Sequence, residues 1–264
     1  MRLCVDFPSA VKVIVGYERV MDKLPNQDVT KRLEKVLIVS RTEASQVKDL
    51  LMKNSFKIVR RNPDFVVCYG GDGTVLFSER KFPQVPKLVV KRVNIRRKCD
   101  YTLYDVKNIL PKIRDGKFRI RKEIKLETEL QNEKLVGLNE IQIRAKLPIY
   151  AIRFSVFVDR KEFGNLIGDG VIVATPFGST GYYKSTGGRQ FRKGIGISFN
   201  NLHNKRIKSF VVPESSLIKV KVNRGPTWVL ADNYEKFFEL KDNVVTTIRK
   251  SKSMANFIYV LRVH

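Results

Sequence analysis

Hydrophobic positions in the first half of the chain come in short continuous runs separated by polar and glycine-rich turns. Residues 36–39 read VLIV and residues 65–69 read FVVCY, and such uninterrupted apolar runs are typical of strands that are covered on both faces. Residues 42–54 carry apolar side chains at helical spacing, and residues 75–81 can form a second helix. This order of strands and helices predicts an α/β domain with a parallel sheet.

From Phe118 onward the pattern changes to a period of two, which is typical of strands with one buried face. The alternating segments are residues 119–129, 139–144, 152–158, 211–222 and 227–230. We therefore expect an α/β nucleotide-binding domain over residues 1–115 and a mainly antiparallel, β-rich domain over residues 116–238. The last segment, residues 239–264, is expected to return to the first domain.

A glycine turn follows the apolar run at residues 65–69 directly, and it reads Gly70-Gly71-Asp72-Gly73-Thr74. In open parallel sheets a ligand binds at the carboxyl ends of the strands, and the N–H groups at the start of the next helix favour a phosphate. The turn therefore predicts a phosphate site into which Asp72 projects its carboxylate. The alternative is a plain β-turn, since glycine and aspartate are also common there.

Residues 168–188 read GDGVIVATPFGSTGYYKSTGG and contain six glycines among several serine and threonine hydroxyls. Glycine lets a ligand approach bare backbone N–H groups, and hydroxyls supply short donors and acceptors. We expect this segment to contact a ligand that carries phosphates and sugars, and not to be a core element. A Gly/Ser surface loop is the alternative, but Asp169, Tyr182 and the closing Gly-Gly favour a functional role.

Lysine and arginine number 51 against 26 acidic residues, a formal charge of +25. This excess indicates a polyanionic partner, and nucleic acid, polyphosphate and nucleotides all remain open on charge alone. The three cysteines are odd in number and far apart, which argues against a disulfide framework or a zinc site and favours a reducing compartment. No apolar run approaches membrane-spanning length, so we expect a cytoplasmic protein with no membrane partner.

Four motifs in order resemble the NAD kinase family, also called ATP-NAD kinases. They are GGDGT at residues 70–74, Asn139-Glu140, the segment 169–188 and Asp232. GGDGT is shared with diacylglycerol and sphingosine kinases and with phosphofructokinases, whereas DG-x3-ATP-x-GSTGY-x2-S-x-GG is much more specific. The resemblance extends from about Lys35 to the C-terminus.

The resemblance implies an N-terminal Rossmann-like α/β domain, a C-terminal mainly antiparallel β domain, and an active site between them in a homo-oligomer, dimeric or tetrameric. It implies transfer of the terminal phosphoryl group of ATP, with a divalent cation such as Mg²⁺, to the adenosine 2′-hydroxyl of NAD to give NADP. Inorganic polyphosphate is a second candidate donor. No residue of the chain is expected to be a dedicated metal ligand.

By the same resemblance Asp72 is expected to accept the proton of the substrate hydroxyl, with Gly73 beside it on the substrate. The other positions that match substrate-binding residues of the family are Asn139, Glu140, Asp169, Thr180, Gly181, Tyr182, Ser185 and Asp232. The first two are expected to hold the adenosine end, and the four from Thr180 to Ser185 to line the adenine and ribose pocket. Asp169 is expected to contact the other half of the dinucleotide.

The phosphate donor is expected to bind at Gly70, Gly71 and Thr74. After Asn94 the family usually has a Gly-x-Leu-Gly-Phe segment, where this chain has IRRKC. We therefore expect Arg96 and Arg97 to contact donor phosphates, with a solvated loop as the alternative.

Two other functions stay open at this point. The first is a lipid or sugar kinase that shares the GGDGT turn, although the chain lacks an obvious apolar substrate surface. The second is a non-catalytic nucleotide- or RNA-binding protein, which the charge of +25 motivates. We do not expect nucleic acid to be a partner of this protein.

Overall fold

The computed structural model describes residues 32–91, 101–203 and 207–260, and the chain divides into two compact units. The first contains the described residues up to Lys122 and from Ala255 onward, and the second is Glu123–Met254. The sequence placed these divisions earlier, after residues 115 and 238. The difference arises because both divisions fall inside continuous strands, β6 (Arg119–Leu130) and β17 (Val245–Tyr259), where the alternation of apolar residues has no break.

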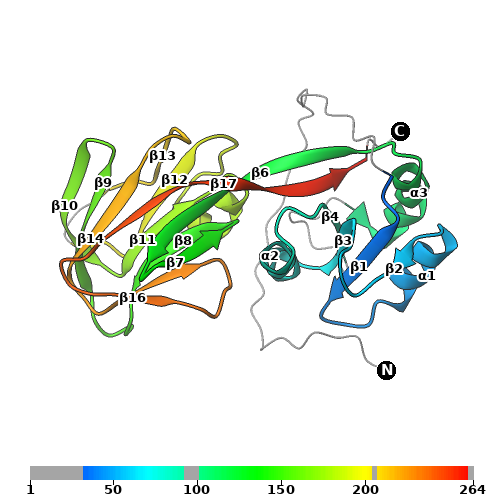
Figure 1. Ribbon diagram of the computed structural model, residues 1–264. Coiled ribbons are helices and arrows are strands. Elements are labelled where there is room, and N and C mark those ends of the chain that lie inside the picture. The colour runs from blue at the N-terminus through cyan, green and yellow to red at the C-terminus, as the bar shows by residue number, and fades with distance from the viewer. Residues whose placement is uncertain (1–31, 92–100, 204–206, 261–264) are drawn as a thin grey trace. The chain divides into compact units, whose positions relative to one another are not determined.

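The first unit is a parallel sheet with helices on both sides (Figure 1). Its strands are β1 (Lys35–Ser40), β2 (Lys57–Ile58), β3 (Phe65–Gly70), β4 (Lys87–Lys91) and β5 (Tyr101–Thr102), and its helices are α1 (Ser45–Lys53), α2 (Asp72–Lys81) and α3 (Leu103–Arg114). The strand order is β4-β3-β1-β2, with β5 and the end of β17 also paired to β4. The chain therefore runs from β1 to β2 on one side and from β3 to β4 on the other, which makes the β1–β3 border the switch point of the sheet.

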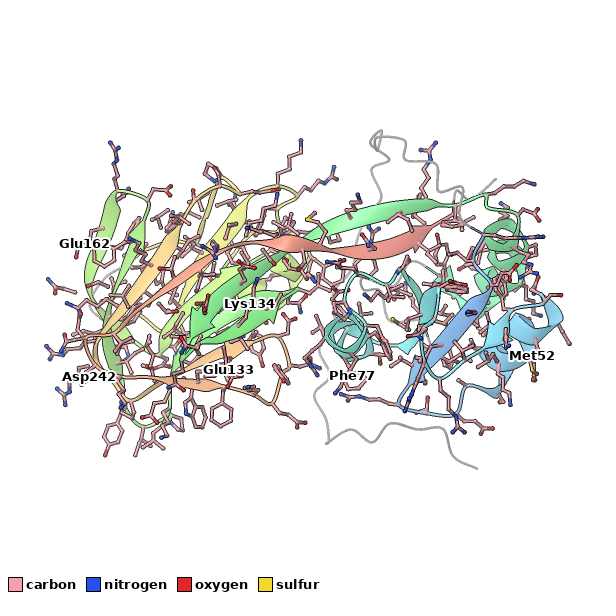
Figure 2. All side chains as sticks on the ribbon, viewed as in Figure 1. Met52, Phe77, Glu133, Lys134, Glu162 and Asp242 are labelled. Atoms are coloured by element: carbon pink, nitrogen blue, oxygen red, sulfur yellow. The ribbon has the colours of Figure 1, made fainter. Side chains whose placement is uncertain are left out.

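Helices α1 and α3 lie on one side of this sheet and α2 lies on the other (Figure 1). Val47 and Leu51 of α1 and Leu110 of α3 are fully buried in one apolar cluster with strand residues such as Val36 and Phe65. The exposed side of α1 carries residues such as Met52, which is 50% exposed and projects away from the sheet in Figure 2. In β3, burial raises the pKa of the Cys68 thiol to about 12, so this cysteine stays a protonated core residue.

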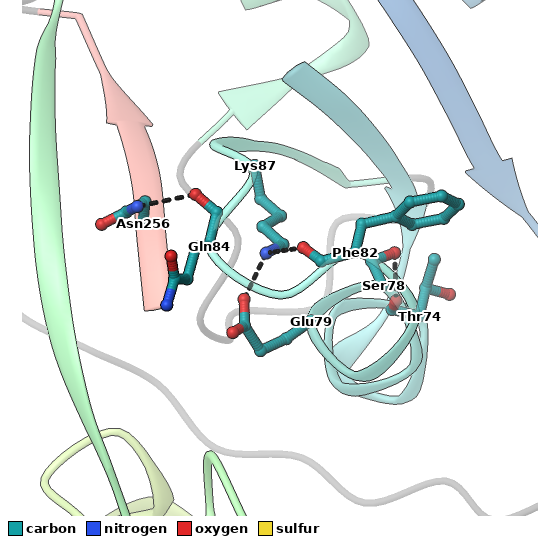
Figure 3. Close-up of polar contacts among 7 residues, drawn as sticks. All are labelled: Thr74, Ser78, Glu79, Phe82, Gln84, Lys87 and Asn256. Atoms are coloured by element: carbon teal, nitrogen blue, oxygen red, sulfur yellow. Dashed lines mark hydrogen bonds and ion pairs between the residues drawn. The ribbon is translucent and has the colours of Figure 1, made fainter. Parts of the chain in front are cut away.

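A buried ion pair fixes the far end of α2 (Figure 3). The Lys87 ammonium at the start of β4 contacts the Glu79 carboxylate, and both side chains are almost fully buried. The same ammonium donates a hydrogen bond to the Phe82 carbonyl oxygen at 2.7 Å. Nearby, Asn256 of β17 donates to the carbonyl oxygen of Gln84 at 2.7 Å. These contacts hold the C-terminal end of α2 against the sheet and thereby define where its N-terminal end, with Asp72, lies.

The second unit packs antiparallel strands from two sheets around one core. One sheet has the order β13-β12-β11-β8-β15-β16, and the other includes β10-β9-β14-β17 and the hairpin of β6 and β7. The bounds are β7 (Glu133–Gly137), β8 (Glu140–Ala145), β9 (Ile152–Val158), β10 (Lys161–Gly168), β11 (Gly170–Ala174), β12 (Ile195–Asn200), β13 (Phe210–Val212), β14 (Ile218–Arg224), β15 (Thr227–Ala231) and β16 (Phe238–Leu240). A short 3₁₀ turn, η1 (Gly178–Thr180), and a single helical turn, α4 (Tyr182–Ser185), follow β11. The predicted fold class, an α/β domain plus a mainly antiparallel β domain, is confirmed.

A buried carboxylate joins β6 to its neighbours in the second unit. Glu127 lies 2.5 Å from the ammonium of Lys134, which Figure 2 labels on β7, and 3.1 Å from Nε of Arg249 on β17. Burial alone would raise the pKa of Glu127, but hydrogen bonds from Lys134, Ser251 and Arg249 outweigh it and lower the pKa below its ordinary value. At the next residue of β6, the hydroxyl of Thr128 lies 2.7 Å from the hydroxyl of Thr246 on β17.

Candidate active site

The glycine turn of the first unit lies where the sequence placed it, at the carboxyl end of β3 beside the switch point. β3 ends at Gly70, Gly71 is the N-cap of α2, and Asp72 is the first residue of the helix. A Cβ atom on Gly70 would lie 2.4 Å from Oγ1 of Thr74, so only glycine allows the turn to close over that buried side chain. Glycine at position 70 is therefore required by the packing of the turn against Thr74.

Asp72 carries a carboxylate oxygen with an unusual environment. Its Oδ1 is inaccessible to solvent and accepts no hydrogen bond from any residue that the structure describes. Such an acceptor costs about 1–3 kcal/mol when it is left without a donor. Its place in the first turn of α2 is favourable for negative charge. Asp72 thus lies at the start of α2 with one carboxylate oxygen enclosed by the chain.

Two motifs of the second unit, Asn139-Glu140 and the segment after β11, pack backbone against backbone. Ala174 is the partner of Glu140 in the β11–β8 pairing, so both motifs lie at the same end of the sheet. Thr175 donates its hydroxyl hydrogen to the Leu138 carbonyl oxygen at 2.6 Å, and its N–H donates to the Asn139 carbonyl oxygen at 2.8 Å. A Cβ on Gly178 would lie 1.9 Å from that same Asn139 oxygen. The two motifs can therefore pack against each other only because residue 178 is a glycine.

The side chains of Asn139 and Glu140 are directed toward the Gly-Ser-Thr-Gly turn. A Cβ on Gly181 would lie 3.3 Å from Oε2 of Glu140 and 3.9 Å from Nδ2 of Asn139. Tyr182 beside it is 49% exposed, and Ser185 donates its hydroxyl to the Tyr182 carbonyl oxygen at 2.8 Å. The structure thus brings together a carboxylate, an amide, a bare glycine, the neighbouring Thr180 and an exposed aromatic ring. These groups suit sugar hydroxyls and the edge and face of a purine.

The expectation that residues 168–188 contain no core element is wrong. β11 is fully buried, and Ser179 and Tyr183 are 0% and 1% exposed. The ring of Tyr183 packs edge-on against Phe191, 5.2 Å between centroids, in a cluster with Ile172. The reason is that α4 turns Tyr182 outward and Tyr183 onto the sheet, so a glycine-rich segment both anchors itself and presents a surface.

Asp232 binds backbone in the structure, and sequence reasoning missed this. Its Oδ1 accepts the N–H groups of Asn139 at 2.7 Å and Glu140 at 3.1 Å, and its Oδ2 accepts the N–H of Leu138 at 2.8 Å. Asp232 itself adopts a φ of 51°, which aspartate tolerates better than most residues. These contacts hold the turn that leads into β8 and so determine where Asn139 and Glu140 point. No spacing rule in the sequence connects residues so far apart.

Asp169 lies away from this cluster. Asp169 comes directly before β11, whereas the Gly-Ser-Thr-Gly turn comes after the other end of that strand. Five residues of extended chain therefore place Asp169 roughly 17 Å from Ala174. Its Oδ2 accepts a hydrogen bond from Nδ2 of Asn201 at 2.7 Å. Within one chain the structure therefore does not bring Asp169 next to Asn139 and Glu140.

The remaining predicted positions can be placed only in part. Arg96 and Arg97, with Asn94 before them, lie outside the described residues. Phe177, which precedes the Gly-Ser-Thr-Gly turn, is 9% exposed and so belongs to the packed part of this segment.

Comparison with known proteins identifies the family. The family model for the ATP-NAD kinase C-terminal domain matches residues 138–260. An NAD kinase from Clostridium botulinum is 30% identical over 219 residues, which cover 78% of this chain and 77% of that one. This chain belongs to the NAD kinase family. An NAD kinase from Clostridium beijerinckii is 31% identical over 174 residues, and that match spans 62% of this chain and 61% of the relative.

Solved structures agree on the fold. Yeast NADH kinase complexed with NADH aligns with a TM-score of 0.77 at 17% identity, over 88% of this chain and 85% of that one. An NAD kinase from Archaeoglobus fulgidus in complex with ATP aligns with a TM-score of 0.74 at 23% identity, over 84% of this chain and 92% of that one. The family match covers all the clustered residues of the second unit, from Asn139 to Asp232. A lipid or sugar kinase and a non-catalytic binding protein are therefore not favoured.

Proposed function

We propose that this member of the NAD kinase family transfers the terminal phosphoryl group of ATP to the adenosine 2′-hydroxyl of NAD, yielding NADP. The observation that carries the proposal is the cluster in which Gly181 lies against the side chains of Asn139 and Glu140. A carboxylate and an amide can accept and donate hydrogen bonds at a ribose, and the absence of a side chain on Gly181 lets the ring approach closely. Thr180, Tyr182 and Ser185 complete the proposed adenosine site.

Asp72 is the proposed general base. A ribose hydroxyl is a weak nucleophile at neutral pH, so a carboxylate within hydrogen-bond reach must take its proton as the bond to phosphorus forms. General-base assistance of this kind is worth roughly 10²–10⁴ in rate. The place of Asp72 in the first turn of α2, directly after the glycine turn at the carboxyl end of β3, supports the assignment. Gly73 follows it in the chain and would present backbone to the same substrate.

The phosphate donor is proposed to bind at the glycine turn and the N-terminus of α2. The positive N-terminal end of α2, which begins directly after Gly70 and Gly71 and has Thr74 in its first turn, favours phosphate oxygens. In the described ranges no group of three or more histidine, cysteine, aspartate or glutamate side chains could hold a metal ion. A Mg²⁺ ion is proposed to be bound mainly through the phosphates of ATP, as is common for this cation. When bound, the ion would neutralise charge on the transferring phosphoryl group. Arg96 and Arg97 stay proposed donor contacts.

Four further assignments remain proposals. Asp169 is proposed to contact the other half of the dinucleotide, and Asp232 to act close to the substrate. Assembly into a dimer or tetramer and residence in the cytoplasm are expected from the family resemblance and the cysteine content. Among the residues that the structure describes, none of the helices is both long and apolar enough to cross a membrane.

A coupled assay on the purified chain tests the proposal. NAD and NADH are each combined with ATP or polyphosphate in the presence of Mg²⁺, and NADP or NADPH is measured with a dehydrogenase specific for the phosphorylated form. We expect NADP from NAD and ATP. A folded protein that yields no phosphorylated dinucleotide from any of the four combinations would refute the proposal, and steep salt-dependent binding to RNA in that case would point to a binding protein.

A further inference from the structure

Gln142 is a polar residue buried on the face of β8 that also carries Glu140. The two lie two positions apart on the strand, so their side chains emerge on the same face of the sheet. In the pairings of β8, Gln142 is opposite Ile172 of β11 and Leu230 of β15. Gln142 is only 3% exposed. A long amide is thus enclosed between strands whose facing residues are apolar.

The side-chain amide of Gln142 is hydrogen-bonded to Glu140. Its Nε2 donates a hydrogen bond to Oε1 of Glu140 at 3.2 Å. Because a carboxylate accepts and does not donate, the NH₂ group must face Glu140, and the orientation of the amide follows from that. Its Oε1 is consequently turned away from Glu140, is inaccessible to solvent and accepts no hydrogen bond from any described residue.

This arrangement is not explained by packing. An apolar side chain of similar length would fill the same space without burying an oxygen that lacks a donor, but it would leave Oε1 of Glu140 without the donor that Gln142 supplies. The adjacent position on β11 is filled in that way by Ile172, which belongs to an apolar cluster with Ala174 and Tyr183. The contact that only an amide can make here is the one with the Glu140 carboxylate.

We propose that Gln142 is a positioning residue for substrate binding: it holds the Glu140 carboxylate in the orientation that faces Gly181. Its hydrogen bond occupies one carboxylate oxygen, Oε1, while the other, Oε2, is the atom nearest to Gly181 among those of Glu140. Gln142 therefore sets which oxygen of Glu140 faces Gly181 at the proposed adenosine site. The inference rests on the proposed function, because it names the residue that orients a member of the same site.

A double-mutant cycle tests this role. In Gln142→Met we expect the KM for NAD to rise about 10-fold, the effect of losing one hydrogen bond to a charged group, with the KM for ATP unchanged. The melting temperature should change little, because losing the hydrogen bond to Glu140 is offset by removing the buried oxygen that lacks a donor. In a Glu140→Ala background the same change at 142 should leave the KM for NAD where Glu140→Ala puts it, because the two residues act as a unit. Leu230→Met, a volume-conserving change on the same face, is the matched control and should change neither quantity.

The outcomes separate the inference from the function on which it rests. If the unaltered protein makes NADP and Gln142→Met keeps the original KM for NAD, the positioning role is wrong and the proposed function stands. An equal KM rise in the presence and absence of Glu140 would also overturn it, since Gln142 would then act by another route. If the unaltered protein makes no NADP, the proposed function fails first and the inference fails with it. Should Gln142→Met not fold, Gln142→Val, which suits a strand, replaces it in the cycle.

Discussion

Replacing Asp232 by asparagine should loosen the turn that carries Asn139 and Glu140, because the Asp232 carboxylate accepts hydrogen bonds from three consecutive N–H groups of that turn. Asparagine keeps the shape of the side chain and one oxygen. That oxygen can still accept from residues 139 and 140, but the new NH₂ group must face the N–H of Leu138, where two donors repel.

The size of the effect can be worked out from these contacts. The substitution removes one hydrogen bond to a charged group, worth about 1.5–3 kcal/mol, and turns two others into neutral hydrogen bonds of roughly half the strength. Because the contacts share one turn and are not additive, we expect a net loss of about 3 kcal/mol for local opening. Since 1.4 kcal/mol corresponds to a factor of ten, the turn should open on the order of 100 times more often.

Native-state hydrogen exchange measures this opening directly. The amides of Leu138, Asn139 and Glu140 should exchange about 100-fold faster in Asp232→Asn, and the KM for NAD should rise while the KM for ATP stays the same. Asp159→Asn is the matched control, because Asp159 also has a positive φ, 52°, but among the described residues it accepts only the N–H of Leu217, in an exposed turn. The control should leave exchange at residues 138–140 unchanged.

Unchanged protection at residues 138–140 would show that Asp232 does not hold the turn. If the KM for NAD rose nevertheless, Asp232 would instead act on the substrate, as the family resemblance suggested. If neither quantity changed, both roles would be excluded.

Three other outcomes are expected. Asp72→Asn should lower kcat by roughly 10²–10⁴-fold without lowering the melting temperature, and retained activity would remove Asp72 from the base role. The control is Asp115→Asn, which changes an exposed carboxylate of the same unit and should leave kcat unchanged. Lys87→Met should destabilise the protein by about 3–5 kcal/mol, because it removes the cation that pairs with the buried Glu79 carboxylate. Adding Glu79→Leu to Lys87→Met should restore most of the melting temperature. A Lys87→Met variant as stable as the original protein would contradict this. Because the pKa of Glu127 is lowered from 4.5, its ionised form stabilises the fold at pH above 4.5, and this contribution should fade as the pH falls through the lowered value. Glu127→Gln should flatten the melting temperature between pH 3 and 5, roughly the range in which a carboxyl group titrates, and an unaltered pH profile would refute the assignment.

Much of the fold could be predicted from the sequence because it depends on local periodicity. Uninterrupted apolar runs such as residues 65–69 predicted buried parallel strands, and alternating runs predicted antiparallel ones, since these patterns follow from which faces of a strand are covered. The position of Asp72 at the carboxyl end of β3 was predictable for the same reason, because the motif follows its strand directly. The unit boundaries were not, because β6 and β17 run through them without a change of pattern.

The pairing of the site's parts in the second unit is a matter of tertiary structure alone. The sequence marked Asn139, Glu140 and the Gly-Ser-Thr-Gly turn separately, by glycine content and by motif, but backbone contacts at Gly178 bring them together. The same holds for Asp232, whose carboxylate finds its N–H partners 92 to 94 residues away. Local patterns record which face of an element is buried. Which oxygen of a side chain meets which N–H depends on how distant strands align, and that alignment is decided by the packing of the whole unit.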